Sequence, residues 1–136
     1  MSMSNDTEVA ALAAFLQGTD PSYRAGATQY LALFTADPTD TADLTNEANY
    51  TGYARVALTK ATAWSGTNPL SNAALIQFDP CTAGTAAVTY FAVVDTGPAR
   101  LTAVNMMISG QLNATLNIAT GIQPQFAAGA ISVSAT

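Results

Sequence analysis

The sequence is poorest in the residues that most often perform chemistry. Its 136 residues include no histidine and one cysteine, Cys81. Acid–base catalysis near neutral pH most often uses histidine, and Ser-His-Asp and Cys-His arrangements require it. A lone cysteine cannot form a disulfide within the chain, and structural zinc needs several cysteine or histidine ligands. We therefore expect no catalytic residue, no cofactor-binding residue and no metal ligand, and expect that the protein is not an enzyme.

Charged residues are also scarce, at 10% of the chain against roughly 25% in an average soluble domain. The net charge is −5, and the four basic residues, Arg24, Arg55, Lys60 and Arg100, are scattered. Binding to phosphate backbones or anionic lipids requires clustered basic groups, so the sequence excludes nucleic acid and membrane surfaces as partners. Because charges are depleted at the centres of interfaces, we expect other protein subunits to cover part of this surface.

The N-terminal segment has no positive charge, and its apolar part is short and rich in alanine. It is typical of neither a signal peptide nor a membrane anchor, so we expect assembly in a cytoplasm.

One loop concentrates acidic residues, with Asp37, Asp40, Asp43 and Glu47 inside eleven positions. Calcium prefers such oxygen ligands, but the spacing differs from that of an EF-hand, which has ligands at alternate positions and a glycine at the sixth. We interpret the segment as a solvated acidic loop.

Aromatic side chains could form a sugar-binding platform. Tyr30 and Tyr90 lie within predicted strands and are expected in the core, whereas Tyr50, Tyr53 and Trp64 lie near loops and are expected to be more exposed. Tyr23 is a further candidate. Carbohydrate binding therefore stays open as a secondary hypothesis.

Residues 1–20 are predicted to form a helical arm. Asn5 and Glu8 have capping-box spacing, and Gly18 is a natural C-terminal stop. Val9, Leu12, Phe15 and Leu16 recur at helical spacing on one face. This apolar face could cover the chain's own β-domain or dock on a neighbouring subunit.

Residues 21–136 are predicted to form one all-β domain, because short apolar runs alternate with turn residues. The pattern favours a compact β-sandwich or jelly-roll-like barrel of about seven or eight strands, preceded by the short N-terminal helix. The expected strands are Gln29–Thr35, Tyr53–Thr59, Ala73–Phe78, Ala87–Asp95, Arg100–Ser109, Thr115–Ala119 and Ile131–Ser134, with a short piece at Gln125–Phe126.

The last part of the chain contains no charged residue after Arg100. Asn and Gln residues interrupt it, so it is not a membrane span. It could consist of buried strands with neutral turns, or it could face a partner or a symmetry axis. We favour the interface interpretation.

Several segments, in order, resemble a family of small tailed-bacteriophage virion structural proteins, which includes capsid decoration (cement) proteins and tail-fibre-like proteins. The resemblance extends from about residue 28 to the end of the chain. The segments are Tyr30–Asp40 (YLALFTADPTD), Gly52–Leu58 (GYARVAL), Ser71–Phe78 (SNAALIQF), Val88–Asp95 (VTYFAVVD) and Phe126–Val133 (FAAGAISV).

The resemblance implies a virion component that is assembled in the host bacterial cytoplasm. We expect a cement protein on the outer capsid surface, since packaged DNA would repel an acidic chain. Its expected partners are the major capsid protein and copies of itself in a homotrimer. The helical arm and the loops at 37–50 and 64–70 are the expected contacts. The alternative is a tail or tail-fibre-associated protein that contacts host glycans.

Overall fold

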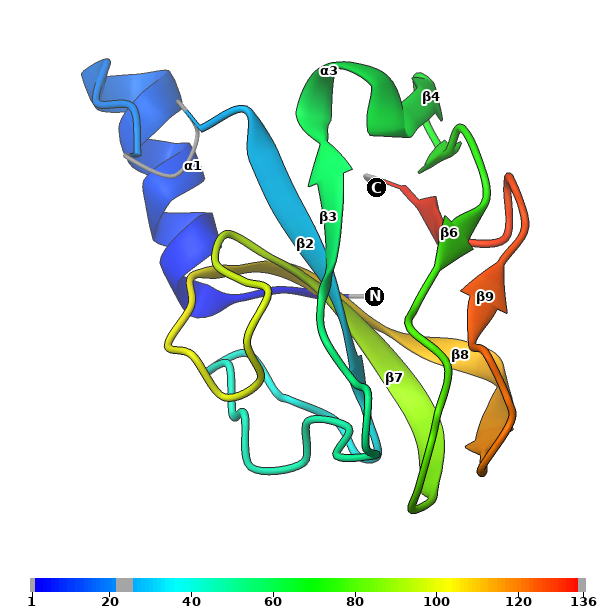
Figure 1. Cartoon of the computed structure of the whole chain (residues 1–136). Helices are drawn as coiled ribbons and strands as arrows, with labels where there is room; N and C mark the ends of the chain where they lie inside the picture. The colour runs from blue at the N-terminus through cyan, green and yellow to red at the C-terminus, as the bar shows by residue number, and fades with distance from the viewer. Residues whose placement is uncertain (1, 22–25, 135–136) are drawn as a thin grey trace.

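The fold is mostly β. The computed structural model describes residues 2–21 and 26–134, and these contain ten strands and two helices (Figure 1). The elements are β1 (Ser2–Met3), α1 (Asn5–Gln17), β2 (Thr28–Phe34), β3 (Val56–Thr59), α3 (Lys60–Ala63), β4 (Trp64–Gly66), β5 (Leu70–Asn72), β6 (Ile76–Gln77), β7 (Ala86–Val94), β8 (Met106–Ile118), β9 (Gln125–Phe126) and β10 (Ser132–Val133).

A five-stranded antiparallel sheet in the order β1-β8-β7-β2-β3 forms the centre of the molecule. Strand β7 lies in the middle because its sequence, AAVTYFAVV, is apolar on both faces and rich in β-branched and aromatic residues. Two smaller antiparallel sheets, β10-β5-β4 and β6-β9, pack nearby.

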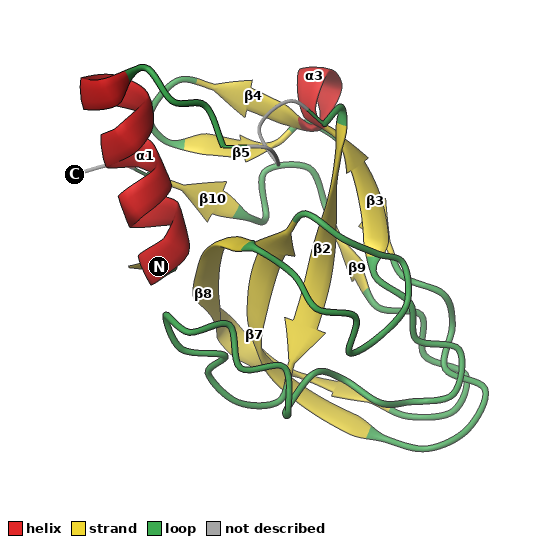
Figure 2. Ribbon diagram, turned by 90° about the vertical axis from the view of Figure 1, so that its left-hand side faces the viewer, coloured by secondary structure: helices red, strands yellow, loops and turns green. Residues whose placement is uncertain are grey.

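Both faces of the central sheet are buried, since successive side chains of a strand point to opposite faces. On β2, Leu31 and Leu33 enter the larger core cluster, which the small strands cover. Ala32 and Phe34 enter a second cluster on the other face. The loops at 35–50 and 95–105 cover that second face, on the side of the molecule where α1 lies (Figures 1 and 2).

Helix α1 begins and ends close to the expected positions. Its N-cap is Ser4, whose hydroxyl accepts a hydrogen bond from the Thr7 amide at 3.3 Å. A serine in this position satisfies an amide that the first turn leaves without a partner, so the cap lies one residue before the expected Asn5. At the other end, Gly18 adopts the left-handed conformation, with φ 69°. That conformation is the one a glycine stop requires.

Several elements differ from the predicted strands, and the strand expected at Ala73–Phe78 is reduced to β6. The expected strands at 100–109 and 115–119 are replaced by a loop followed by the single long strand β8, which passes through Gly110 without a break. The pairing of β7 with β8 absorbs the extra residues, since Val88 is opposite Leu116 but Tyr90 is opposite Gln111. The loop expected at 64–70 is instead the hairpin β4–β5, in which Ser65 pairs with Ser71 and Gly66 pairs with Leu70.

The predicted all-β class with a short N-terminal helix is therefore confirmed at the level of a mostly β fold in three antiparallel sheets. The jelly-roll arrangement is not confirmed by this strand order. The N-terminal arm contributes β1 to the central sheet, where Ser2 and Met3 pair with Ser109 and Ile108.

Candidate interaction surfaces

The acidic loop does not bring its four carboxylates together. Asp37 accepts the Thr39 amide at 2.8 Å, and Asp40 accepts the Ser2 hydroxyl at 2.6 Å. Hydrogen bonds from the Thr45 side chain and backbone lower the pKa of Asp43, which is exposed. Within residues 2–21 and 26–134, no three His, Cys, Asp or Glu residues form a group that could hold a metal ion.

Glu47 departs from the prediction of a solvated loop, because it is buried in an ion pair with Arg55. Arg55 Nε lies 2.7 Å from Glu47 Oε1, and Nη2 lies 2.9 Å from Oε2. These two parallel bonds make the pair bidentate. Arg55 also donates to the Thr96 carbonyl at 2.7 Å and to the Thr102 carbonyl at 3.1 Å. The pair therefore ties the loop at 35–50 to the loop at 95–105.

The tyrosines predicted to be more exposed are instead packed inside. Tyr50 is 3% exposed and donates to the Asp79 carbonyl at 3.0 Å. Burial, with the nearby Cys81 and Asp79, raises the pKa of Tyr50 to about 12. Tyr53 donates to Glu47, and burial followed by the Glu47 charge raises its pKa far above the usual value. These hydroxyls complete internal hydrogen bonds and offer no platform for sugars.

The remaining aromatic candidates are divided. Tyr30 and Tyr90 pack against the second core cluster, as expected for strand residues, and Tyr23 lies outside the described residues. Trp64 is partly buried against the larger cluster.

Cys81 is 1% exposed, and its thiol donates to the Ala83 and Gly84 carbonyls at 3.3 and 3.4 Å.

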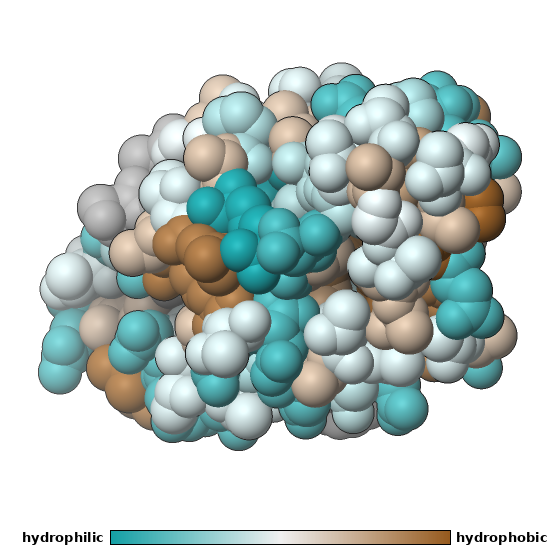
Figure 3. All heavy atoms as spheres, turned by 60° about the horizontal axis from the view of Figure 1, so that its bottom comes forward, coloured by the Kyte–Doolittle hydropathy of each residue, from teal (hydrophilic) through white to brown (hydrophobic). Residues whose placement is uncertain are grey.

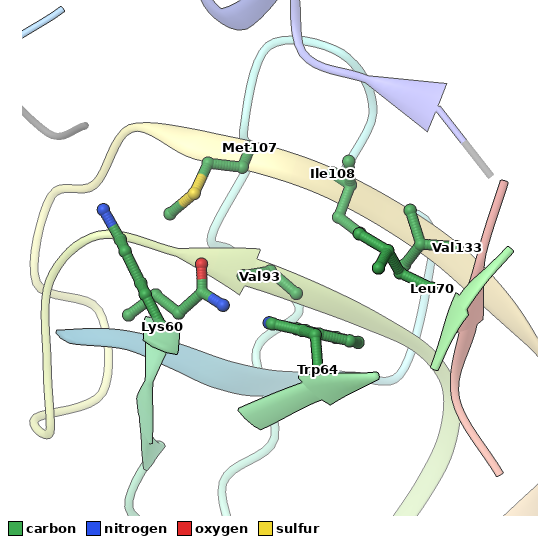
Figure 4. A pocket seen from close by; sticks show the side chains of 8 residues that line it. Lys60, Trp64, Leu70, Val93, Met107, Ile108 and Val133 are labelled. Atoms are coloured by element: carbon green, nitrogen blue, oxygen red, sulfur yellow. The ribbon is translucent and has the colours of Figure 1, made fainter. Parts of the chain in front are cut away.

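An apolar pocket of about 300 Å³ lies on the face of the central sheet that carries the larger core cluster. Figure 4 shows its arrangement: Met107 and Ile108 of β8 lie along one side, and Trp64 of β4 lies on the other. Lys60 stands at the end away from Leu70 and Val133. The complete lining is Gln29, Lys60, Trp64, Leu70, Val93, Met107, Ile108 and Val133.

The outward face of α1 exposes several large apolar side chains. Its four predicted face residues, Val9, Leu12, Phe15 and Leu16, are 60–84% exposed. The partly buried side of the helix instead carries Thr7 and alanines at positions 10, 11, 13 and 14. The expectation that these large side chains cover the chain's own β-domain is therefore wrong.

The outer edge of β8 is a third surface. Strand β1 pairs with it only at Ile108 and Ser109, and no described strand pairs with it beyond that point. Exposed, uncharged side chains follow: Gln111, Asn113, Thr115 and Asn117. The part of the chain after Arg100 thus contributes a buried core side chain, Ile118, as well as an open strand edge.

The face at the loop end mixes residues of different hydropathy. Much of it is of intermediate hydropathy, with polar and apolar areas between (Figure 3). None of the helices in the described segments is long and apolar enough to span a membrane.

The sequence predicted no pocket, but two of its lining residues belong to predicted contacts: Trp64 was a candidate aromatic contact, and Leu70 ends the expected contact loop at 64–70. The lining comes from β2, β7, β8, β10 and the α3–β5 segment, so no short motif contains it. The burial of Glu47 was not predicted from the sequence either, although Glu47 and Arg55 are among the few charged residues and Arg55 lies within the apolar run YARVAL.

Comparison with known proteins identifies a family. Residues 2–134 match the model of the family described as Podophage GP4 fiber I protein gp80. No curated protein matches the sequence. The matched range includes all five segments that carry the resemblance to tailed-bacteriophage virion structural proteins, and that resemblance is confirmed.

Proposed function

The chain belongs to this family of phage virion structural proteins, and from that premise we propose that it is a non-catalytic fibre subunit. It works by packing against copies of itself and against other proteins of the virion. The fibre assignment, which at first was the alternative to a capsid cement protein, is supported by the words of the family description.

The observation that carries the proposal is the outward face of α1. A chain with few charges presents four large apolar side chains to solvent on a helix whose other side carries alanines. Contiguous exposed apolar patches on small proteins mark sites of protein–protein interaction. The free chain is therefore a subunit whose surface is completed by assembly.

A capsid cement protein, bound to the major capsid protein on the outer shell, is the second candidate. Its net charge of −5 favours a position away from packaged DNA. The same surfaces would serve either location, and the two locations differ in the number of copies per virion. Glycan contact belongs to the fibre assignment, with the partly buried Trp64 as the candidate contact.

Imaging of intact virions with an antibody against this chain would test the proposal. Label on fibres or the tail, at low copy number per particle, is the expected result. Label distributed over the shell at high copy number would favour the cement function, and absence from the purified virion would contradict both. A glycan array with the unmodified chain and Trp64→Ala would test the sugar contact separately.

A further inference from the structure

We propose that the outward face of α1 on one copy of the chain inserts Phe15 and Leu16 into the apolar pocket of a second copy. The inference rests on the proposed function as a self-assembling subunit and identifies the contact that joins neighbouring copies. It gives the large exposed side chains and the open pocket one common explanation.

The inserting element is held in place before assembly. Phe15 is 84% exposed and Leu16 is 80% exposed, the highest values among the large apolar side chains of the described residues. The helix that carries them is anchored at its start, where the Ser4 and Thr7 hydroxyls donate to the Met106 carbonyl and the Asn5 amide donates to the Asp40 carbonyl. A preorganised helix loses little conformational entropy on binding, which favours association.

The receiving element matches the inserting one in chemistry. The pocket has a volume of about 300 Å³ and six apolar lining residues, so it suits an aromatic or branched side chain. Such pockets are the typical receptors of the few side chains that dominate an interface. Leu70 at its rim is 37% exposed, so the pocket is open to an incoming chain.

The charges of the two elements are also complementary. Helix α1 carries Asp6 and Glu8 in its first turn and no basic residue in its last turn. The pocket has Lys60 at one end and no acidic residue among the described residues that line it (Figure 4). A helix laid across the pocket with its first turn toward Lys60 would bring opposite charges together and orient the insertion.

A chain cannot fill its own pocket in this way. Helix α1 is anchored to Met106 and Asp40, beside the sheet face that carries the second core cluster. The pocket opens on the opposite face, where Val93, Met107 and Ile108 belong to the larger cluster (Figures 1 and 4). The contact therefore joins different surfaces of two copies, and such a heterologous contact closes into a ring when its rotation allows.

Cross-linking between two single variants tests the contact. Phe15→Cys and Leu70→Cys chains of different mass are mixed and treated with a short bismaleimide. Cys81 is 1% exposed, and the unmodified chain serves as the control for its reaction. We expect a cross-linked pair containing one chain of each kind, with little product from either variant alone.

The alternatives give different products. Cross-linking of Phe15→Cys to itself would overturn the proposal in favour of helix–helix pairing. Absence of any product in a solution that light scattering shows to be oligomeric, or a chain that stays monomeric at its highest soluble concentration, would also overturn it. The virion location is measured independently, so failure here does not imply failure of the proposed function.

Trp64 provides a second readout, because it is the only tryptophan and it lines the pocket. Its fluorescence emission should shift to shorter wavelength as the protein concentration rises. The shift should be lost in Phe15→Ser/Leu16→Ser and kept in Leu75→Ser, a control that removes an apolar side chain that is 51% exposed elsewhere. An equal loss in the control would contradict a specific contact.

Discussion

At the scale of single residues, the chain places part of its small supply of charge in the interior. Glu47 and Arg55 are each 2% exposed, and the Arg55 guanidinium also binds the backbone of the loop at 95–105. Removing one member of a buried pair leaves an uncompensated charge, which costs far more than the loss of an exposed ion pair. The pair therefore makes two long loops depend on one interaction.

Glu47→Gln should lower the free energy of unfolding by about 3–5 kcal/mol, since Arg55 would stay buried without its counter-charge. Chemical denaturation followed by circular dichroism measures the change. Asp37→Asn is the matched control from the same loop, because the Asp37 carboxylate is exposed. This control should change stability by no more than about 0.5 kcal/mol, as surface substitutions usually do. Equal effects of the two variants would argue against an essential buried pair.

Stability should fall at alkaline pH because of the buried tyrosines. The folded-state pKa of Tyr50 is about 12 against an ordinary value of 10.0, and that of Tyr53 is also raised. A group whose pKa is higher in the folded state stabilises fully below its unfolded pKa. The contribution of Tyr50 is therefore complete below about pH 10 and is lost as the pH rises toward 12.

Melting temperatures measured from about pH 9 upward should decline once the unfolded-state pKa of 10.0 is passed. Tyr50→Phe should be less stable at neutral pH, since it loses the hydrogen bond to the Asp79 carbonyl, but its decline at alkaline pH should be shallower. An unchanged slope in this variant would show that Tyr50 does not contribute to the alkaline transition.

At the scale of secondary-structure elements, the docking of α1 depends on its first turn. Ser4 caps the helix and also donates to the Met106 carbonyl, so one hydroxyl both starts the helix and fixes it to β8. Ser4→Ala should cost about 1 kcal/mol of helix stability.

Hydrogen exchange measures the effect of Ser4→Ala directly. The amides of α1 should exchange faster in the variant, while those of β7 should be unchanged, because β7 lies in the centre of the sheet. Ser65→Ala, at an exposed position of β4, is the control. Unchanged exchange in α1 would mean that Ser4 does not hold the helix.

The elements also illustrate which features the sequence could predict. Strand β7 was predicted within one residue at each end because its apolar run is long and bounded by turn residues. The hairpin β4–β5 was missed because each of its strands has three residues, too few to show a period. Strand β8 was divided in two because Gly110 suggests a turn, whereas in the fold it is buried opposite Phe91.

The candidate interaction surfaces also differ in how far the sequence could predict them. The apolar stripe of α1 was predicted from four residues within eight positions. Its outward orientation was not, because the side of the helix that packs inward carries alanines, and a hydrophobic period favours the larger side chains for that side. The residues that line the pocket come from strands far apart in the sequence. They could not be grouped without knowing how those strands are arranged in the fold.

Ile118 shows the same limit, because it lies in the charge-free part of the chain for which the interface interpretation was favoured. It is 2% exposed in the chain's own core. Ile118→Asp would therefore bury an unpaired carboxylate and destabilise the fold instead of reporting on a contact between subunits.

At the scale of the whole molecule, the homotrimer stays a prediction. A heterologous contact between copies would produce it if three copies close into a ring. Light scattering of the purified chain at micromolar concentration should give a mass near three chains. Phe15→Ser/Leu16→Ser should shift the mass toward one chain without changing the circular dichroism spectrum. A trimer that survives in this variant would assign the interface to another surface.

The outer edge of β8 makes the folded but unassembled chain prone to aggregation over time. Among the described residues, it presents unpaired backbone groups beside Gln111, Asn113, Thr115 and Asn117. These side chains lack the charge that usually prevents strand-to-strand addition. The hazard grows with the concentration of the unassembled chain and with time. Rapid assembly into a particle should therefore limit aggregation at this edge. The solubility of the chain then depends on how soon assembly follows synthesis.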